Sequence, residues 1–269
     1  ATAVIAGSVF VQVLRNGDIT ASTVIVAFLV CCAVSILFGA FNGTLVAVFK
    51  IQPMIATLIL FTCGRSIAYW INGGATPTVS SPLIEALGGF IPGVPVPTPV
   101  FIVILCGLVF VLLFRFTNLG FYTQAVGINQ QAARLNGIHA TWMKMLTFII
   151  LGICVAVAGC IRVGRLGLVN HETLLIDVEM DAILAVAIGG NALGGGKFNM
   201  VGTVLGAYAI QALTTTLYAM KVPSTEIKAY KAVVIILLVV IGSNVVKDAA
   251  NRLWNRLARK TAPVITERS

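Results

Sequence analysis

The chain has 269 residues, of which 58% are hydrophobic and only 10% are charged. Soluble domains carry about 45–50% apolar and about 25% charged residues, so this composition argues against a soluble fold. The net charge of +9 would suit nucleic acid, but much of the excess lies in a basic C-terminal stretch, which in a membrane protein is better explained as a cytoplasmic anchor. Nucleic acid is therefore excluded as a partner, and membrane lipid is expected.

Apolar runs follow one another along nearly the whole chain. A helix needs about 20 apolar residues to cross a hydrocarbon core about 30 Å thick. The runs cover residues 1–14, 22–49, 53–71, 99–116, 142–161, 174–190, 201–220 and 227–246. The first run is too short for a complete span, so we expect further residues before it. The pattern predicts an all-α, polytopic transmembrane helical bundle of about eight spans over residues 1–246, followed by a basic cytoplasmic tail over residues 247–269.

The loops between the runs give the expected orientation. Residues 72–98 hold five prolines and no Lys or Arg, which is typical of a loop outside the cytoplasm. If this loop lies outside and successive loops alternate between the two sides of the membrane, Arg134, Lys197 and the tail lie in the cytoplasm. Without the tail, five basic residues lie inside and six outside, so the orientation depends on the tail and on the proline-rich loop.

Small side chains are frequent within the runs. The six cysteines have no CxxC spacing and no Cys/His cluster, so we expect small buried thiols and no disulfide framework, metal site or cofactor. Gly39 and Gly43, like Gly202 and Gly206, are spaced so that helix backbones can approach closely.

A few polar side chains interrupt the apolar pattern. Arg65 lies in mid-span, where an unpaired charge is costly, so we expect a partner in the protein interior, with a helix-end carbonyl favoured over a transported solute. We expect a solvated helix end with one packed acid among Glu172, Asp177, Glu179 and Asp181, and solvated loop positions for His139 and His171. Candidates for solute contact, which helix packing explains equally well, are Asn42, Thr57, Thr62 and Gln211.

One hydrophilic segment carries the signals of a short helix outside the bilayer. Asn129 is a favourable N-cap and Gly137 a natural stop, which predicts a two-turn helix over residues 130–136. Its surface combines small and apolar side chains with one cation and suits a shallow groove on another protein. These residues are Ala132, Ala133, Arg134 and Leu135. Because an isolated helix this short is marginal in water, we expect a docking partner.

The same segment resembles the ATPase-facing coupling motif of the ribose/galactoside class of permeases from bacterial ATP-binding-cassette sugar importers. That motif reads close to A-x-G-x-N-x-x-A-A-R-L-x-G-I. The matching positions are Ala125, Gly127, Asn129, Ala132, Ala133, Arg134, Leu135, Gly137 and Ile138. The resemblance implies that residues 118–141 form the segment through which an ATPase drives the permease.

Residues 175–198 resemble a Gly-rich signature of the same family. Positions that match are Asp181, Ala182, Ile183, Ala185, Val186, Gly189, Gly190, Leu193, Gly195 and Gly196, and Glu179 agrees with an acid of the signature. The glycines permit a close turn between two helices, and the expected turn contains Gly189, Gly190, Gly194, Gly195 and Gly196. A phosphate-binding loop would require Gly at position 191 and Ser or Thr at position 198, where this chain has Asn191 and Phe198. Nucleotide chemistry must therefore come from a partner.

The resemblance implies a permease subunit, not itself an enzyme, that forms the path for a monosaccharide across a bacterial inner membrane, with the C-terminus in the cytoplasm. Its expected partners are an ATP-binding cassette subunit, a periplasmic sugar-binding protein and a second permease chain, identical or paralogous. Residues 41–60 lean towards the galactofuranose-type branch.

Two other functions stay open beside this one. An ion-gradient-driven secondary transporter of a small polar solute would need paired intramembrane carboxylates, for which Asp181 alone is a candidate. An intramembrane enzyme would need a Ser/Lys, Asp/Asp or His/Glu constellation at depth, and the sequence offers none.

Overall fold

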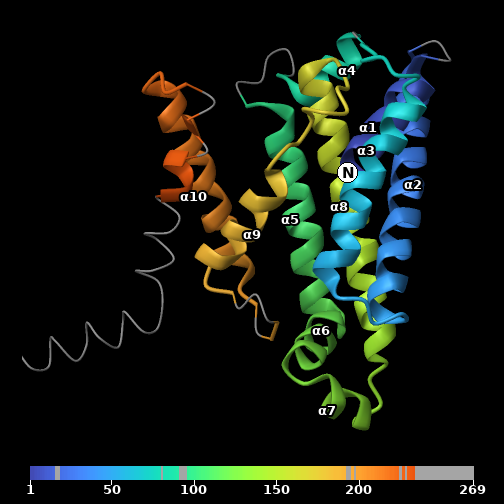
Figure 1. Cartoon of the computed structure of the whole chain (residues 1–269), viewed down its shortest axis with the longest axis vertical. Helices are drawn as coiled ribbons and strands as arrows, with labels where there is room; N and C mark the ends of the chain where they lie inside the picture. Colours follow the sequence, from blue (N-terminus) through green and yellow to red (C-terminus); the bar gives the residue numbers. More distant parts are fainter. Residues whose placement is uncertain are drawn as a thin grey trace, which may run out of the picture. The chain divides into compact units, whose positions relative to one another are not determined.

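The computed structural model describes residues 1–15, 19–79, 81–90, 96–191, 195–196, 198–223, 226–227 and 229–233. These residues form helices joined by turns and loops, with two isolated β-bridges between loop residues. In chain order the helices are α1 (Thr2–Arg15), α2 (Ala21–Ala47), α3 (Pro53–Ile71), α4 (Pro82–Gly88), α5 (Thr98–Phe116), α6 (Leu119–Ile128), α7 (Gln130–Leu135), α8 (Ala140–Leu166), α9 (Val178–Ile188) and α10 (Met200–Ala219) (Figure 1). The chain divides into two compact units, Ala1–Ile176 and Asp177–Ser269.

Five of the described helices, α2, α3, α5, α8 and α10, are long and apolar enough to cross a membrane. The prediction of an all-α, polytopic bundle is confirmed. The apolar helix α1 has 14 residues, in line with the short first run of the sequence. The last predicted run, residues 227–246, lies mostly outside the described residues, and the predicted tail, residues 247–269, lies wholly outside them.

Two predicted segments differ from the structure. Residues 174–190 were expected to form one continuous span, but α9 has only 11 residues, because the chain before it turns and Asp177 takes a left-handed φ of 64°. At 1.5 Å per residue, α9 is about half as long as a span. The proline-rich loop also contains a helix, α4, which begins at Pro82, whose fixed φ suits a first helical position.

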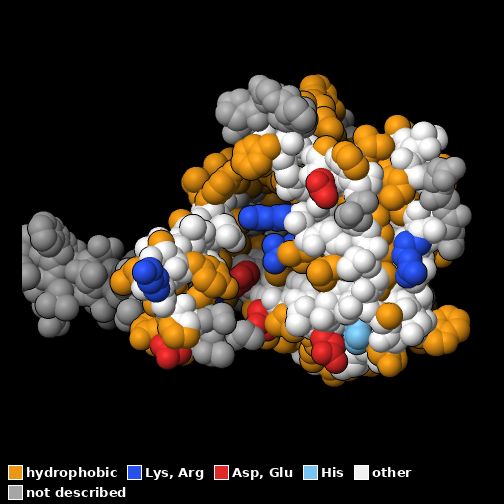
Figure 2. Space-filling view, turned by 90° about the horizontal axis from the view of Figure 1, so that it is seen from above, with side chains coloured by type: hydrophobic (Ala, Val, Ile, Leu, Met, Phe, Trp, Pro, Cys, Tyr) orange, Lys and Arg blue, Asp and Glu red, His pale blue; other side chains and the backbone are white. Residues whose placement is uncertain are grey.

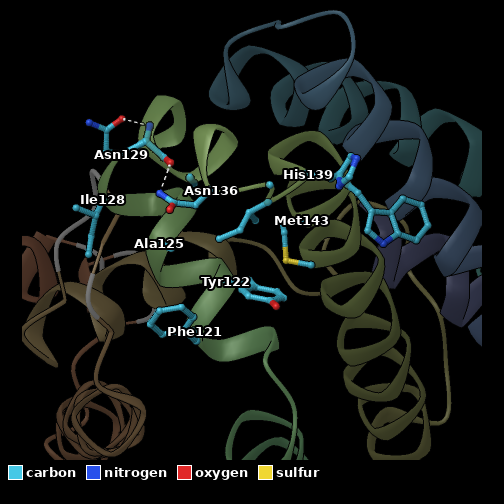
Figure 3. A pocket seen from close by; sticks show the side chains of 13 residues that line it. Phe121, Tyr122, Ala125, Ile128, Asn129, Asn136, His139 and Met143 are labelled. Atoms are coloured by element: carbon cyan, nitrogen blue, oxygen red, sulfur yellow. Dashed lines mark hydrogen bonds between the residues drawn. The ribbon is translucent and has the colours of Figure 1, made fainter.

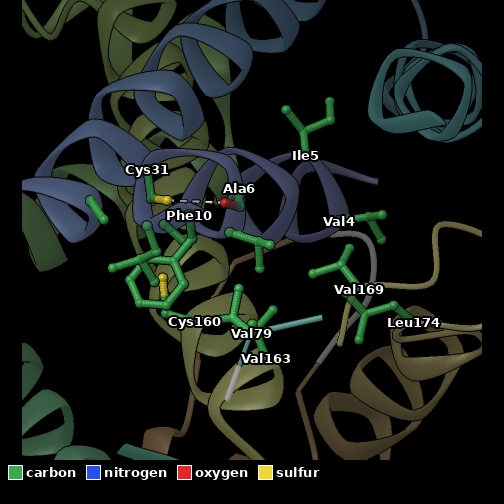
Figure 4. Close-up of a cluster of buried hydrophobic side chains, with 14 of the residues drawn as sticks. Val4, Ile5, Ala6, Phe10, Cys31, Val79, Cys160, Val163, Val169 and Leu174 are labelled. Atoms are coloured by element: carbon green, nitrogen blue, oxygen red, sulfur yellow. Dashed lines mark hydrogen bonds between the residues drawn. The ribbon is translucent and has the colours of Figure 1, made fainter. Parts of the chain in front are cut away.

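The core of the first unit is built around α1, which contacts α2, α3 and α8. Val4, Ile5 and Phe10 of α1 are at most 1% exposed and belong to one buried cluster with Cys31 of α2 and Cys160 of α8 (Figure 4). The Cys31 thiol donates a hydrogen bond to the Ala6 carbonyl at 3.0 Å. The prediction of small buried thiols is therefore confirmed at these two positions, whereas Cys63 is exposed.

The helices α2 and α8 run antiparallel and approach closely at glycines. A Cβ on Gly39 would lie 2.6 Å from the Phe148 carbonyl oxygen, and a Cβ on Gly152 would lie 2.5 Å from the Ser35 carbonyl oxygen. Lipid gives no hydrophobic drive for helix association, so close van der Waals contact between backbones has to supply it. The predicted role of Gly39 in close packing is confirmed.

The outer surfaces of the helices are strongly apolar. No residue of α5 is buried, although the helix consists almost entirely of large apolar side chains. Figure 2 views the molecule from above, along its long axis, and at this end Lys, Arg, Asp and Glu side chains appear among the apolar ones. The apolar surface of α5, by contrast, is of the kind that hydrocarbon stabilises and water does not.

Candidate functional site

The short helix α7 is capped as the sequence predicts. The side-chain Oδ1 of Asn129 accepts hydrogen bonds from the backbone N–H groups of Gln131 at 2.9 Å and Ala132 at 3.0 Å. Its backbone is extended, with φ −152° and ψ 104°, as an N-cap residue requires. Two of the N–H groups that a helix start leaves without an internal partner are thus satisfied.

The other end of α7 closes at Gly137, which has a left-handed φ of +80°. The N–H of Gly137 donates to the Arg134 carbonyl and that of Ile138 to the Ala133 carbonyl, both at 3.0 Å. The side-chain amide of Asn136 adds a hydrogen bond to the Ala132 carbonyl at 2.9 Å. The predicted N-cap at Asn129 and the stop at Gly137 are confirmed, and the helix ends at Leu135, one residue before the predicted end.

The inner side of α7 is held against α6 and α8. Ala133 is 4% exposed and packs in a buried cluster with Val126 of α6 and with Ala140 and Met143 of α8. Ala133 was expected on the docking surface, and this expectation is wrong, because its methyl group faces the protein. At the start of the helix, the Lys144 ammonium donates to the Gln130 side-chain oxygen at 2.7 Å and ties α7 to α8.

The outer side of α7 is open. Ala132 and Arg134 are exposed, and Leu135 is 90% exposed. Gly127 is also exposed, near the end of α6. Arg134 is the only Lys, Arg, Asp or Glu between residues 118 and 141. The surface therefore combines apolar and amide side chains with one positive charge, which suits a groove that includes a carboxylate.

Two hollows flank this helix. One, of about 680 Å³, lies between α6, α7 and the start of α8 (Figure 3). Its lining includes Phe121, Tyr122, Ile128, Asn129, Ala132, Asn136, His139 and Met143. The second, of about 460 Å³, lies along residues 137–142 and includes Arg134 and Met145. His139 is exposed, as predicted, and lines both hollows.

The Gly-rich turn joins α9 to α10. Gly190, Gly195 and Gly196 have φ values of 79°, 96° and 112°, so the predicted positive φ is confirmed at these positions, while Gly194 lies outside the described residues. Gly189 is needed for close packing and not for a positive φ, because a Cβ there would lie 2.5 Å from the Gly202 carbonyl carbon. The two helices therefore touch backbone to backbone at the turn.

Asn191 fastens this turn and was missed as a structural residue by the sequence analysis. Its side-chain N–H donates to the Thr203 hydroxyl at 2.8 Å, to the Val186 carbonyl at 3.2 Å and to the Asn199 carbonyl at 3.3 Å. Its side-chain oxygen accepts from the Asn199 N–H. An Asn directly after two glycines was the available signal, since such residues favour turns.

Arg65 has the kind of partner that was predicted. Its Nη1 donates to the backbone carbonyls of His171 at 2.6 Å and Glu172 at 3.0 Å, and its guanidinium carbon lies 4.9 Å from the centre of the Phe61 ring. The prediction of a solvated His171 is wrong, because its side chain is 17% exposed and packs edge-on against Tyr69 with ring centres 4.8 Å apart. Arg65 therefore fixes the segment that follows α8.

The chain is similar to known permeases over most of its length. A family model described as "Branched-chain amino acid transport system / permease component" matches residues 1–242. The galactofuranose transporter permease protein YtfT of Escherichia coli is 40% identical over 212 residues, which cover 77% of this chain and 61% of that protein. No solved structure matches the chain.

Two further relatives carry other sugar names. The fructose import permease protein FruF of Bifidobacterium longum is 35% identical over 263 residues, which cover 95% of this chain and 72% of the relative. The ribose import permease protein RbsC of Escherichia coli is 35% identical over 223 residues, which cover 81% of this chain and 68% of that protein.

Proposed function

The chain belongs to the family described as "Branched-chain amino acid transport system / permease component", and from this premise we propose that it is the permease subunit of an ATP-binding-cassette importer for a monosaccharide. The names of the relatives, for galactofuranose, fructose and ribose, favour a sugar over an amino acid as the solute. In this assembly the permease forms the path and a separate ATP-binding cassette subunit hydrolyses ATP. A periplasmic sugar-binding protein and a second permease chain, identical or paralogous, complete the importer.

The observation that carries the proposal is the exposed side of α7. This helix has six residues, yet both its ends are capped and its inner side is held by Ala133. Helices of this length are unstable alone, so a preformed one with Leu135 almost fully exposed is suited to bind another protein. We place α7 and the C-terminus on the cytoplasmic side of a bacterial inner membrane, where the ATPase subunit would contact Ala132, Arg134 and Leu135.

Coupling then follows from the way α7 is attached. ATP binding would move the ATPase surface, and α7 would carry that movement into α8 through Ala133 and through the Lys144–Gln130 hydrogen bond. The permease dimer would shift between inward-facing and outward-facing states, whose populations ATP controls by binding one of them more tightly.

The ion-driven alternative has less support. It requires carboxylates that gain and lose protons together within the membrane. Asp181 instead forms an ion pair with Lys231, at 2.8 Å. Its partner among the described residues is thus a cation and not the second carboxylate that such a carrier requires.

The proposal is tested by replacing Ala132 with Trp. The indole would stand on the exposed side of α7 and hold an ATPase subunit away, so ATP-dependent uptake by reconstituted permease, ATPase and binding protein should fall about tenfold or more. Radiolabelled D-ribose, D-fructose and D-galactose serve as solutes.

Ala219→Trp is the matched control, since Ala219 is an exposed alanine at the end of α10. It should leave uptake within about twofold of the wild type. Ala133→Trp is unsuitable because it would disrupt the buried cluster. Normal uptake by a correctly inserted Ala132→Trp protein contradicts the coupling role of α7.

A further inference from the structure

Asp181 of α9 and Lys231 form a two-pronged ion pair in the second unit. The Lys231 ammonium lies 2.9 Å from Oδ1 and 2.8 Å from Oδ2 of Asp181. The side chains of Lys231 and Asp181 are 16% and 32% exposed. The pair is therefore partly sheltered, but it can still be reached by a small molecule.

The packing of α9 on α10 indicates the depth of this pair. At the turn Gly189 faces Gly202, and one helical turn further on a Cβ on Gly206 would collide with the Ala185 carbonyl oxygen. Continuing the same antiparallel register by one more turn places Asp181 level with Ile210, which is near the middle of the 20 residues of α10. Since α10 is long and apolar enough to cross the membrane, this level is close to the centre of the bilayer.

Charges at this depth need an explanation. An ionised side chain facing hydrocarbon is costly, so such groups face the protein interior or a water-filled cavity. Packing alone is a weak reason for an ion pair here, because apolar side chains of similar volume often stabilise a buried site equally well.

The backbone supports the same interpretation. The helix α9 begins only at Val178, directly after the left-handed Asp177, so it does not continue beyond mid-depth. Non-helical backbone within a membrane is tolerated where it lies against protein or lines a water-filled cavity. Interrupted helices of this kind carry solute sites near the midplane in transporters.

The chemistry of the pair matches a neutral polyhydroxylated solute. An ammonium group has three N–H donors, of which the two carboxylate oxygens take two, and a carboxylate can accept about four hydrogen bonds in all. One donor and several acceptors thus lie side by side. Neighbouring ring hydroxyls of a sugar each donate and accept a hydrogen bond. A neutral sugar leaves the ion pair intact, so the contact stays weak enough to release it.

We propose that Asp181 and Lys231 contact the hydroxyl groups of the sugar as it passes through the membrane. This inference rests on the proposed function, because it needs a permease that carries a sugar. It assigns a solute contact to Asp181, which the sequence analysis grouped with three other acids at a solvated helix end, and to its ion-pair partner Lys231.

The experiment uses the complete importer, with permease, ATPase and sugar-loaded binding protein in proteoliposomes. Uptake of radiolabelled D-ribose, D-fructose and D-galactose and the ATP hydrolysis stimulated by the binding protein are measured on the same vesicles. The variants are Asp181→Asn, the charge exchange Asp181→Lys with Lys231→Asp, and the control Glu179→Gln. Glu179 is an exposed acid in the same helical turn, and no ion pair joins it to another described residue.

For Asp181→Asn we expect uptake to fall about tenfold or more, because hydrogen bonds to a charged group are lost, while stimulated ATP hydrolysis changes less than about twofold. The charge exchange restores the ion pair, and hence the packing, but reverses donor and acceptor positions, so uptake stays low. Glu179→Gln should transport normally. The preference of the wild type for its sugar over the 2-deoxy analogue should shrink in the charge-exchange variant.

Recovery of uptake in the charge-exchange variant overturns the inference, since the pair would then be structural. Unchanged uptake by Asp181→Asn overturns it as well. If Asp181→Asn fails to assemble, the charge-exchange variant decides alone, because assembly without uptake supports the contact and assembly with uptake refutes it. A wild-type importer that carries none of the three sugars overturns both the proposed function and this inference, whereas the other results leave the proposed function standing.

Discussion

Replacing Gly152 with Ala should loosen the contact between α2 and α8. The added Cβ would lie 2.5 Å from the Ser35 carbonyl oxygen and 3.7 Å from the Cα of Gly39. Because both atoms belong to the backbone of α2, no change of rotamer relieves the overlap and the helices have to separate. Overpacking of this kind costs about 1–3 kcal/mol, against a gain of about 1 kcal/mol for Ala over Gly inside a helix. We expect a net loss of up to about 2 kcal/mol in the free energy of unfolding.

Gly107→Ala in α5 is the matched control. It makes the same chemical change in another apolar helix, but nothing lies within 4 Å of the added Cβ. The gain in helix propensity then stands alone, so this variant should be as stable as the wild type or more stable, by up to about 1 kcal/mol.

Thermal labelling of buried thiols measures the difference. Cys31 on α2 is 0% exposed and Cys160 on α8 is 4% exposed, so a fluorogenic maleimide reaches them only when these helices part. The exposed Cys63 is first replaced by Ser to lower the background. The labelling midpoint of Gly152→Ala should fall by about 2–4 °C per kcal/mol lost. An unchanged or raised midpoint, like that expected for Gly107→Ala, would refute the reasoning.

Two further predictions concern single hydrogen-bonding side chains. Asn129→Ala removes the cap from the Gln131 and Ala132 N–H groups, which should cost about 1 kcal/mol and speed amide exchange in α7 about fivefold. Asn118→Ala is its control, since Asn118 precedes α6 without a side-chain cap bond, and equal exchange in both variants would contradict the capping argument. Arg65→Gln removes the cation that donates to the His171 and Glu172 carbonyls. This loss should lower the free energy of local opening by about 1.5–3 kcal/mol and speed amide exchange over residues 167–174 accordingly. Arg65→Lys should show a smaller effect, and no change in either variant would show that Arg65 does not hold this segment.

Local signals in the sequence were enough for the ends of α7. Capping depends on residues within one turn of the helix end, so the roles of Asn129 and Gly137 could be predicted without knowledge of any tertiary contact. Which side chains of α7 are buried could not be predicted from such local signals. Ala132 and Ala133 are neighbours of the same type, and only the position of α8 decides that Ala133 is buried.

Contacts between distant residues account for the other differences. The side chain of His171 is sheltered by Tyr69, which belongs to another helix, so a loop position in the sequence gave the wrong environment. The start of α9 was hidden because residues 174–176 are as apolar as the helix that follows, while the break depends on the left-handed backbone at Leu175 and Asp177. Lys231, which pairs with Asp181, lies 50 residues further along the chain.

Close contacts along α8 explain how a small movement at α7 could reach the opposite end of the first unit. The helix α8 has 27 residues, which makes it about 40 Å long. At its start it is joined to α7 by the Ala133 cluster, and in its middle Gly152 rests on the backbone of α2. Near its end, the Cβ position of Gly164 lies 2.9 Å from the Ile84 carbonyl oxygen of α4. Because each contact is made with backbone atoms or a buried methyl group, it leaves little room for side chains to absorb a displacement. A force applied to α7 by the proposed ATPase partner would therefore shift α8 as one body, and Gly152→Ala should weaken coupling as well as stability.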